Sequence, residues 1–169
     1  MTNRHHLTDT PIGALTLVAD GGALAGVYFP QHRHQPDPTT FGPRDSTDPV
    51  LVTAARQLDE YFDGERTEFD LVVSSRGDTF QSRVWAMLRK IPYGETTTYG
   101  TLASRLGNVG MARAVGAAVG RNPLSIVVPC HRVVGRNGSL TGFAGGLERK
   151  AALLELEGAH PEVPQLFAS

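Results

Sequence analysis

The chain has 169 residues, of which 40% are hydrophobic and 20% charged, and a formal net charge of −1 at pH 7. That length is enough for one compact domain or two small ones, and no apolar run approaches the roughly 20 residues of a membrane-spanning helix. The single cysteine excludes an internal disulfide and fits a reducing compartment, and the N-terminus lacks the apolar segment of a signal peptide. We therefore expect a cytoplasmic protein without a membrane partner.

Metal chemistry is poorly supported, because the sequence contains neither of the common zinc-binding motifs, CxxC and HExxH. The histidines of the N-terminal region lie in polar and proline-rich surroundings, and we expect them to be solvated: His5, His6, His32 and His34. We predict no metal site and no cofactor.

The N-terminal part of the chain predicts a small sheet and one helix. Residues 7–29 have strand-like alternation, and the turn Asp20-Gly21-Gly22 between two apolar runs predicts a β-hairpin. A proline-rich loop covers residues 30–49, and a short strand is predicted over Phe69–Val73. The intervening helix begins at Asp48 or Pro49 and ends at Gly64, with one apolar face made by Val52, Ala55, Leu58 and Phe62. We interpret residues 1–76 as an α/β scaffold domain without chemistry of its own.

Residues 77–169 predict a mainly helical domain, so the expected fold class is α+β. Asp78-Thr79 caps a first helix, and Thr98 caps a second helix that Gly107 ends. A short turn at 107–110 separates this second helix from a third, Met111–Gly120, which is the pattern of a helix-turn-helix. A last helix runs from Leu147 to Glu157.

The third of these helices has almost only alanine and glycine at its exposed positions, apart from Arg113. Such a helix cannot read bases through side-chain hydrogen bonds, but its backbone can press into a narrow groove while Arg113 reaches inward. Tight packing inside the protein is the alternative, because small residues serve that purpose as well.

Charges are unevenly distributed along the chain. Residues 1–95 hold thirteen acidic and nine basic side chains, whereas residues 96–147 hold five arginines and no acid. Because the acid-free block contains the only cysteine, it indicates a polyanionic substrate near that thiol, most simply nucleic acid. A solvated basic face is the ordinary alternative.

Cys130 is the candidate nucleophile. An apolar, β-branched run predicts a strand that Pro129 stops one residue before the thiol, and His131 follows directly. A neighbouring imidazole favours the reactive thiolate form, although a lone cysteine is often only a small buried hydrophobe. Glu157 projects between the sides taken by Leu153 and Leu154, so it could be buried against His131. Periodicity alone favours a solvated helix end for that glutamate.

Two further segments flank the cysteine. Asn122 ends the alanine-rich helix just before Pro123, where it could hold a turn or merely stop the helix. The glycine-rich loop of residues 140–146 could line a flat pocket with Phe143 as a wall, or could be a flexible link.

Five blocks of the sequence together resemble the O6-alkylguanine-DNA alkyltransferases. They are Pro129-Cys130-His131-Arg132-Val133, the segment 120–123, the segment 112–116, the segment 93–100 and the segment 153–157. The resemblance is dense and in order over residues 79–157, and the first 75 residues fit the looser N-terminal domain of the family.

The resemblance implies direct-reversal DNA repair. The alkyl group of O6-alkylguanine, and of O4-alkylthymine, in duplex DNA would pass irreversibly to Cys130 in a single turnover. The family binds the minor groove and flips the damaged base out of the helix. Double-stranded DNA would be the partner of a monomer that has no obligate protein partner. The zinc that some members hold through N-terminal cysteines would be absent.

The resemblance also assigns roles to individual residues. Cys130 would be the acceptor thiolate, His131 would take its proton through a water, Glu157 would polarise that histidine, and Asn122 would bridge helix and active-site turn. Arg113 would fill the gap left by the flipped base, and Tyr99 would push on the 3′ phosphate. The DNA contacts would include Gly100, Asn108 and Arg136, and the base pocket Tyr99, Val133 and Phe143. Phe143 stands where some relatives carry a tyrosine, so it has no hydroxyl to offer the base.

Two other classes of function fit parts of the pattern. A helix-turn-helix regulator with Cys130 as a sensor would bind one unmodified duplex sequence specifically. A cysteine hydrolase with a Cys-His-Glu triad would turn over repeatedly and would leave the arginine block without a purpose.

Overall fold

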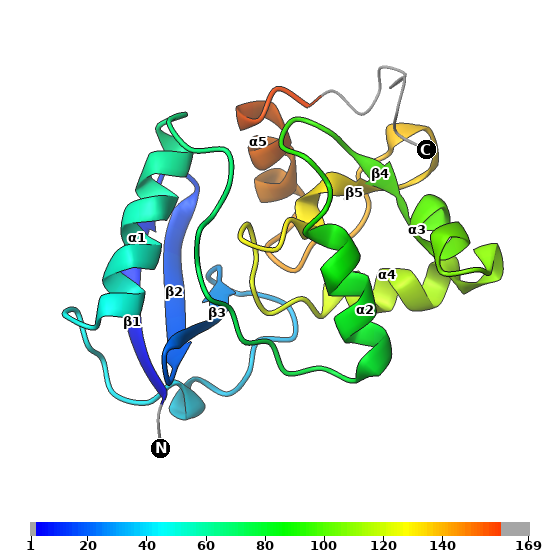
Figure 1. Cartoon of the computed structure of the whole chain (residues 1–169). Coiled ribbons are helices and arrows are strands. Elements are labelled where there is room, and N and C mark those ends of the chain that lie inside the picture. Colours follow the sequence, from blue (N-terminus) through cyan, green and yellow to red (C-terminus); the bar gives the residue numbers. More distant parts are fainter. Residues whose placement is uncertain (1–2, 160–169) are drawn as a thin grey trace.

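The structure is a computed structural model that describes residues 3–159. Its N-terminal part is an antiparallel sheet of three strands in sequential order, with a helix packed against the sheet (Figure 1). Asp48 begins that helix by accepting a hydrogen bond from the backbone N–H of Leu51, and Pro49 occupies its first turn. These elements are β1 (Asn3–Thr10), β2 (Gly13–Asp20), β3 (Ala23–Tyr28) and α1 (Pro49–Phe62).

The C-terminal part is helical, which confirms the α+β fold class. Asp78 and Thr98 cap their helices as predicted, each by accepting a backbone N–H from the first turn. The helices are α2 (Thr79–Leu88), α3 (Tyr99–Arg105), α4 (Ala112–Gly120) and α5 (Leu147–Leu156). Two very short strands, β4 (Thr97–Thr98) and β5 (Val133–Val134), pair in parallel. Single 3-10 turns are η1 (Pro38–Phe41), η2 (Val109–Met111), η3 (Cys130–Arg132) and η4 (Arg136–Gly138).

The buried face of α1 differs from the prediction. The helix buries Leu51, Ala54, Leu58 and Tyr61, whereas Val52 is 47% exposed. Two apolar stripes lie side by side on this helix, and helical periodicity does not choose between them. Packing against the sheet selects the stripe that carries Tyr61, and this brings a phenol into the interior.

Two predicted strands are absent from the described chain. Residues 124–129 form irregular turns, with Ile126 at a positive φ of 73° and local hydrogen bonds such as Val128 N–H to Leu124 O. Only Leu124 meets the sheet, through a single bridge to Val27. The segment 69–73 likewise contributes one bridge, from Val73 to Leu24. β-Branched residues suit buried irregular backbone as well as strands, so composition alone misassigned both segments.

The prediction that His32 is solvated is also wrong. Its side chain is 7% exposed, its Nδ1 accepts the backbone N–H of Phe29 at 3.2 Å, and its ring stacks on that of Phe29. The imidazole therefore fixes the conformation of the loop that follows β3 by its contacts with Phe29.

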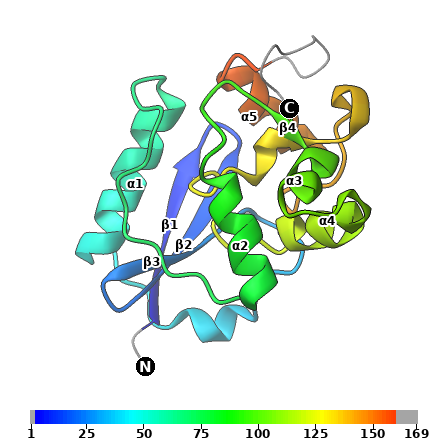
Figure 2. The same cartoon turned by 45° about the vertical axis from the view of Figure 1, so that its right-hand side comes forward.

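One hydrophobic core runs through both parts of the chain. It joins Leu17 and Leu58 of the N-terminal part to Trp85, Val115 and Val128 of the C-terminal part in a single cluster. Figures 1 and 2 both show α2 between the sheet and the α3–α4 pair. The two parts are thus held in a fixed relation, and residues from either can complete one site. Within residues 3–159, no helix is both long and apolar enough to cross a membrane.

Candidate active site

Cys130 lies at the inner wall of a small cavity. It begins η3, directly after Pro129, and the short β4–β5 pairing ties the segment that follows to the start of α3. The side chain is 5% exposed, and the cavity has a volume of about 210 Å³. The other lining residues come from three separate regions: the loop at Arg33 and His34, the helices at Tyr99, Gly116, Ala117, Val119 and Gly120, and the loop at Gly142, Phe143 and Ala144.

Asn122 fixes the turn that presents the cysteine. Its Nδ2 donates to the carbonyl of Val128 at 2.8 Å, and its Oδ1 accepts the backbone N–H of Leu124 at 3.0 Å. Burial raises the pKa of the Cys130 thiol, while the amide of Asn122 and the charge of Lys150 act in the opposite direction. The resting thiol is therefore protonated, and reaction at neutral pH requires a base.

His131 has the properties of that base. It is fully buried, and its Nε2 lies 2.8 Å from Oε2 of Glu157. Burial lowers the pKa of His131, although the hydrogen bond to Glu157 opposes the shift, so the ring is neutral at rest. Since Glu157 is an acceptor, the single ring proton resides on Nε2, and Nδ1 keeps its lone pair. Nδ1 is buried and has no partner among residues 3–159.

Glu157 is the hub of a buried hydrogen-bond network. Burial alone would raise the pKa of Glu157, but the hydrogen bonds from His131 and Arg132 hold it well below its usual range. Arg132 donates from Nε to Oε1 at 2.8 Å and from Nη2 to Oε2 at 2.9 Å. Tyr61, from α1, donates its hydroxyl to Oε2 at 2.7 Å. A fixed carboxylate of this kind orients the imidazole and stabilises it once protonated.

Lys150 is a fully buried cation beside the cysteine. Its Nζ donates to the carbonyls of Val133, Thr141 and Gly142 at 2.5, 2.8 and 3.2 Å. Burial lowers its pKa to about 8, and the charge of Cys130 acts against that shift. The lysine therefore ties the glycine-rich loop to β5 and supplies positive charge near the sulfur.

The structure brings some of the predicted site residues together and leaves others apart. Tyr99 and Phe143 line the cavity with Cys130, and the Tyr99 hydroxyl donates to Thr141 O at 3.1 Å. Val133 is fully buried and is not among the lining residues. The other predicted DNA contacts lie outside the cavity: Gly100 at the start of α3, Asn108 before η2, Arg113 on α4 and Arg136 on η4. Of these, Asn108 caps η2 through Gly110 N–H, and Arg113 is exposed.

Sequence reasoning missed several residues that border this site. Lys150 could have been found, because it lies three and seven positions before Leu153 and Glu157, on the same buried stripe of the last helix. Tyr61 was missed because the wrong face of α1 was assigned to the core. Arg33 and His34 gave no signal, since they belong to a loop that reaches the site only through the tertiary fold.

Comparison with known proteins places this geometry among DNA repair proteins. Residues 3–74 match the family description "6-O-methylguanine DNA methyltransferase, ribonuclease-like domain", and residues 79–159 match the DNA binding domain of the same description. Together the two matches span most of the chain.

Individual relatives agree along nearly their whole length. A "Methylated-DNA--protein-cysteine methyltransferase" of Mycobacterium bovis is 50% identical over 155 residues, covering 90% of this chain and 92% of the relative. One with the same description from Methanosarcina acetivorans is 44% identical over 154 residues, covering 89% and 96%. The crystal structure of Mycobacterium tuberculosis OGT in complex with DNA has a TM-score of 0.84 and 47% identity, covering 94% of this chain and 96% of that one.

Proposed function

The chain belongs to the 6-O-methylguanine DNA methyltransferase family and is a DNA repair alkyltransferase, and we propose that it acts by one irreversible transfer of an alkyl group to Cys130. The substrates are O6-alkylguanine and O4-alkylthymine in duplex DNA. The observation that carries this proposal is a cysteine on a small cavity next to a neutral histidine whose free nitrogen is buried.

The first step is removal of the thiol proton. Nδ1 of His131 is the available base, and a water between sulfur and ring carries the proton to it. The Glu157 carboxylate, 2.8 Å from Nε2, stabilises the imidazolium that forms. The Lys150 charge stabilises the thiolate that is left behind.

The second step is an in-line displacement. The thiolate attacks the alkyl carbon, the carbon–O6 bond breaks, and the electron pair of that bond passes to guanine. Guanine then takes up the proton that left the thiol, so the products are a thioether at Cys130 and an unmodified base. No group in the described site is placed to cleave a thioether, so each protein molecule is inactivated by the transfer.

The position of the sulfur supports base flipping. Cys130 is 5% exposed at the wall of a cavity, so an alkyl group on a base stacked within a duplex cannot reach it. The α3–α4 pair supplies the helix-turn-helix surface. The exposed Ala114 and Ala117 and the half-buried Gly116 of α4 let its backbone approach the minor groove closely. Arg113, on the exposed side of that helix, fills the space that the base leaves. On this reading residues 77–169 form the alkyltransferase domain and residues 1–76 its support.

Intact-mass spectrometry tests this function. After incubation with a duplex that contains O6-methylguanine, the wild-type protein should gain one methyl mass and never more than one per chain. Cys130→Ala should gain none and should still bind the duplex, because the substitution removes one buried sulfur atom and leaves the exposed side chains of α4 in place. Release of many equivalents of repaired base by unmodified protein would show that the chain is a turnover enzyme and not a sacrificial acceptor.

A further inference from the structure

The loop after β3 is held in an unusual conformation against the active-site loop. Gln31 and His34 both have positive φ angles, 57° and 60°, which residues with side chains seldom adopt. His32 pins the loop from inside through Phe29, and the backbone N–H of Arg33 donates to Ala144 O at 2.8 Å. Strain of this kind persists where the surrounding structure enforces it, frequently at functional sites. In this loop, the conformation leaves the side chains of Arg33 and His34 exposed on the surface.

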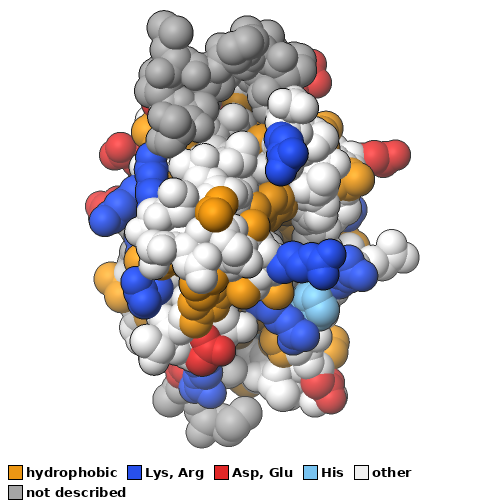
Figure 3. All heavy atoms as spheres, turned by 90° about the vertical axis from the view of Figure 1, so that its right-hand side faces the viewer, with side chains coloured by type: hydrophobic (Ala, Val, Ile, Leu, Met, Phe, Trp, Pro, Cys, Tyr) orange, Lys and Arg blue, Asp and Glu red, His pale blue; other side chains and the backbone are white. Residues whose placement is uncertain are grey.

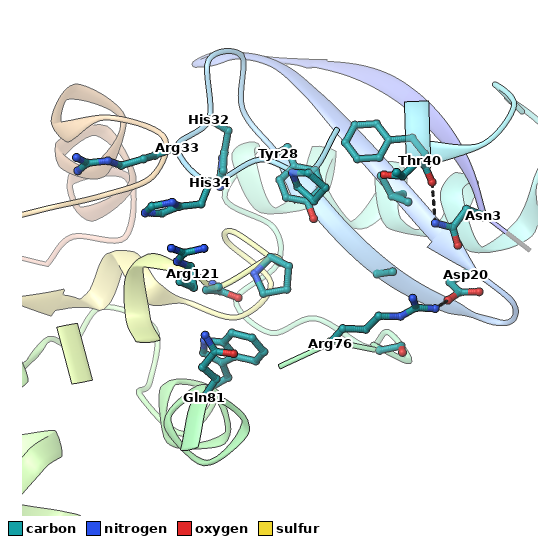
Figure 4. Close-up of a pocket in the computed structure, with 18 of the residues that line it drawn as sticks. Asn3, Asp20, Tyr28, His32, Arg33, His34, Thr40, Arg76, Gln81 and Arg121 are labelled. Atoms are coloured by element: carbon teal, nitrogen blue, oxygen red, sulfur yellow. Dashed lines mark hydrogen bonds and ion pairs between the residues drawn. The ribbon is translucent and has the colours of Figure 1, made fainter. Parts of the chain in front are cut away.

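Arg33 and His34 stand where two cavities meet. Both line the cavity that contains Cys130, and both also line a larger cavity of about 510 Å³ between the sheet and α2. Arg121, just after α4, lines the larger cavity. Figure 4 shows the Arg121 guanidinium directed toward the His34 ring, with Arg33 on the same loop. Arg33 and His34 therefore stand at the rim of the Cys130 cavity, and Arg121 lies beside His34 on the side of the larger cavity.

These three basic groups have no acidic counterpart. The pKa of His34 is lowered, by slight burial and then by the positive charges of Arg121 and Arg33. Within residues 3–159, none of the three forms an ion pair. Two acids line the cavities that these residues border. Asp20 lines the larger cavity and pairs with Arg76 at 2.9 Å, and Glu148 lines a further cavity that Arg33 also borders. Figure 3 shows basic side chains and a histidine side by side on the face that carries α3 and α4.

We propose that Arg33, His34 and Arg121 form a phosphate-binding subsite for the DNA strand that delivers the alkylated base to Cys130. The inference rests on the proposed function. A nucleotide that enters the cavity brings its own phosphodiester links to the rim. An anion there relieves the mutual repulsion of the two arginines and favours the protonated form of His34. Arginine suits the task, because its planar guanidinium donates two hydrogen bonds to one phosphate. The N-terminal part of the chain thus binds substrate.

The test is the salt dependence of binding to a duplex with one O6-methylguanine. Loss of one phosphate contact is expected to reduce the slope of log K against log salt by about 0.9, which corresponds to about eightfold weaker binding at about 0.1 M salt. Arg33→Ala and Arg121→Ala should each show this change. Arg44→Ala is the matched control, an exposed arginine of the N-terminal part that lines neither cavity, and should leave the slope unchanged.

Replacing single phosphates of the DNA by uncharged analogues identifies which phosphate the subsite binds. Duplexes carry one methylphosphonate at each position flanking the lesion in turn. Wild-type protein should lose affinity at one of these positions, and Arg33→Ala should be insensitive to the same replacement. An unchanged slope, or equal sensitivity of wild type and variant at every position, would overturn the subsite.

Reaction with the free base O6-benzylguanine tests the phosphate subsite separately from the proposed alkyl transfer to Cys130. The variants should lose far more of their rate with duplex DNA than with the free base. Equal losses would mean that the residues shape the cavity and do not bind phosphate. If wild-type Cys130 gains no alkyl group from either substrate, the proposed function fails, whatever the salt slopes show.

Discussion

Replacement of Tyr61 by phenylalanine isolates the contribution of the N-terminal part to the catalytic network. The variant removes only the hydroxyl that donates to Oε2 of Glu157 at 2.7 Å. Tyr61 is 0% exposed, so water cannot replace the lost donor without rearrangement. A hydrogen bond to a charged group contributes about 1.5–3 kcal/mol to stability. Because Oε2 retains His131 at 2.8 Å and Arg132 at 2.9 Å, we expect a loss near the lower end, about 1.5–2 kcal/mol.

Urea denaturation followed by circular dichroism measures this loss. The midpoint should fall while the m-value stays constant, because the surface exposed on unfolding does not change. Tyr93→Phe is the matched control. Its hydroxyl donates to Leu156 O at 3.4 Å from a partly exposed position, so its removal should cost less than about 0.5 kcal/mol.

The reasoning would be refuted if both tyrosine variants changed the free energy of unfolding by the same small amount. Such a result would mean that the Tyr61 hydroxyl is as well satisfied by solvent as by Glu157. The network would then be confined to the C-terminal part.

Two further predictions concern the other buried charges. Lys150→Met should lower the free energy of unfolding by about 3 kcal/mol, because three buried carbonyls lose their donor. The same variant should shift the pH dependence of Cys130 alkylation by iodoacetamide to higher pH. Lys90→Met is the control, at the only other lysine of the sequence, which is exposed, and it should have neither effect. Acid should destabilise the protein in two stages, because the unfolded chain takes up protons that the folded chain does not. The folded pKa of His131 lies below its ordinary 6.5, so the free energy of unfolding decreases as the pH falls below 6.5. The folded pKa of Glu157 lies below its ordinary 4.5, so a second decrease begins as the pH falls below 4.5. Urea midpoints between about pH 8 and pH 3 check this, and a midpoint that rose on acidification would contradict both assignments.

Local signals in the sequence predicted the helices well. Caps at Asp48, Asp78 and Thr98 are side-chain interactions within one turn, so they are visible in a short stretch of sequence and all three are present. The irregular path of residues 124–129 was not predictable in this way. Its backbone is held by Asn122 and by burial between the two parts of the chain, and neither constraint leaves a periodic pattern.

The site was predictable where its residues share one helix stripe or one motif. Cys130 and His131 are adjacent, and Glu157 lies on the stripe of Leu153 and Leu154, so its burial against His131 was foreseeable as one of two outcomes. The structure selects burial because Tyr61 and Arg132 supply further donors to the same carboxylate. Those partners decide the outcome, and one of them lies 96 positions away in the sequence.

The N-terminal part was predicted to be a scaffold, and its contacts require more than that. Tyr61 reaches the buried side of the site at Glu157, and the Arg33 backbone holds the outer loop at Ala144. A part that served only as support would tolerate any substitution that preserved its fold. The Tyr61 hydroxyl contacts the Glu157 network, whereas the Arg33 side chain lines the rim of the Cys130 cavity. Substitutions at Tyr61 should therefore affect the stability of the network, and those at Arg33 the binding of DNA. Independence of the two effects in the double variant would show that the N-terminal part serves the site at two distinct points.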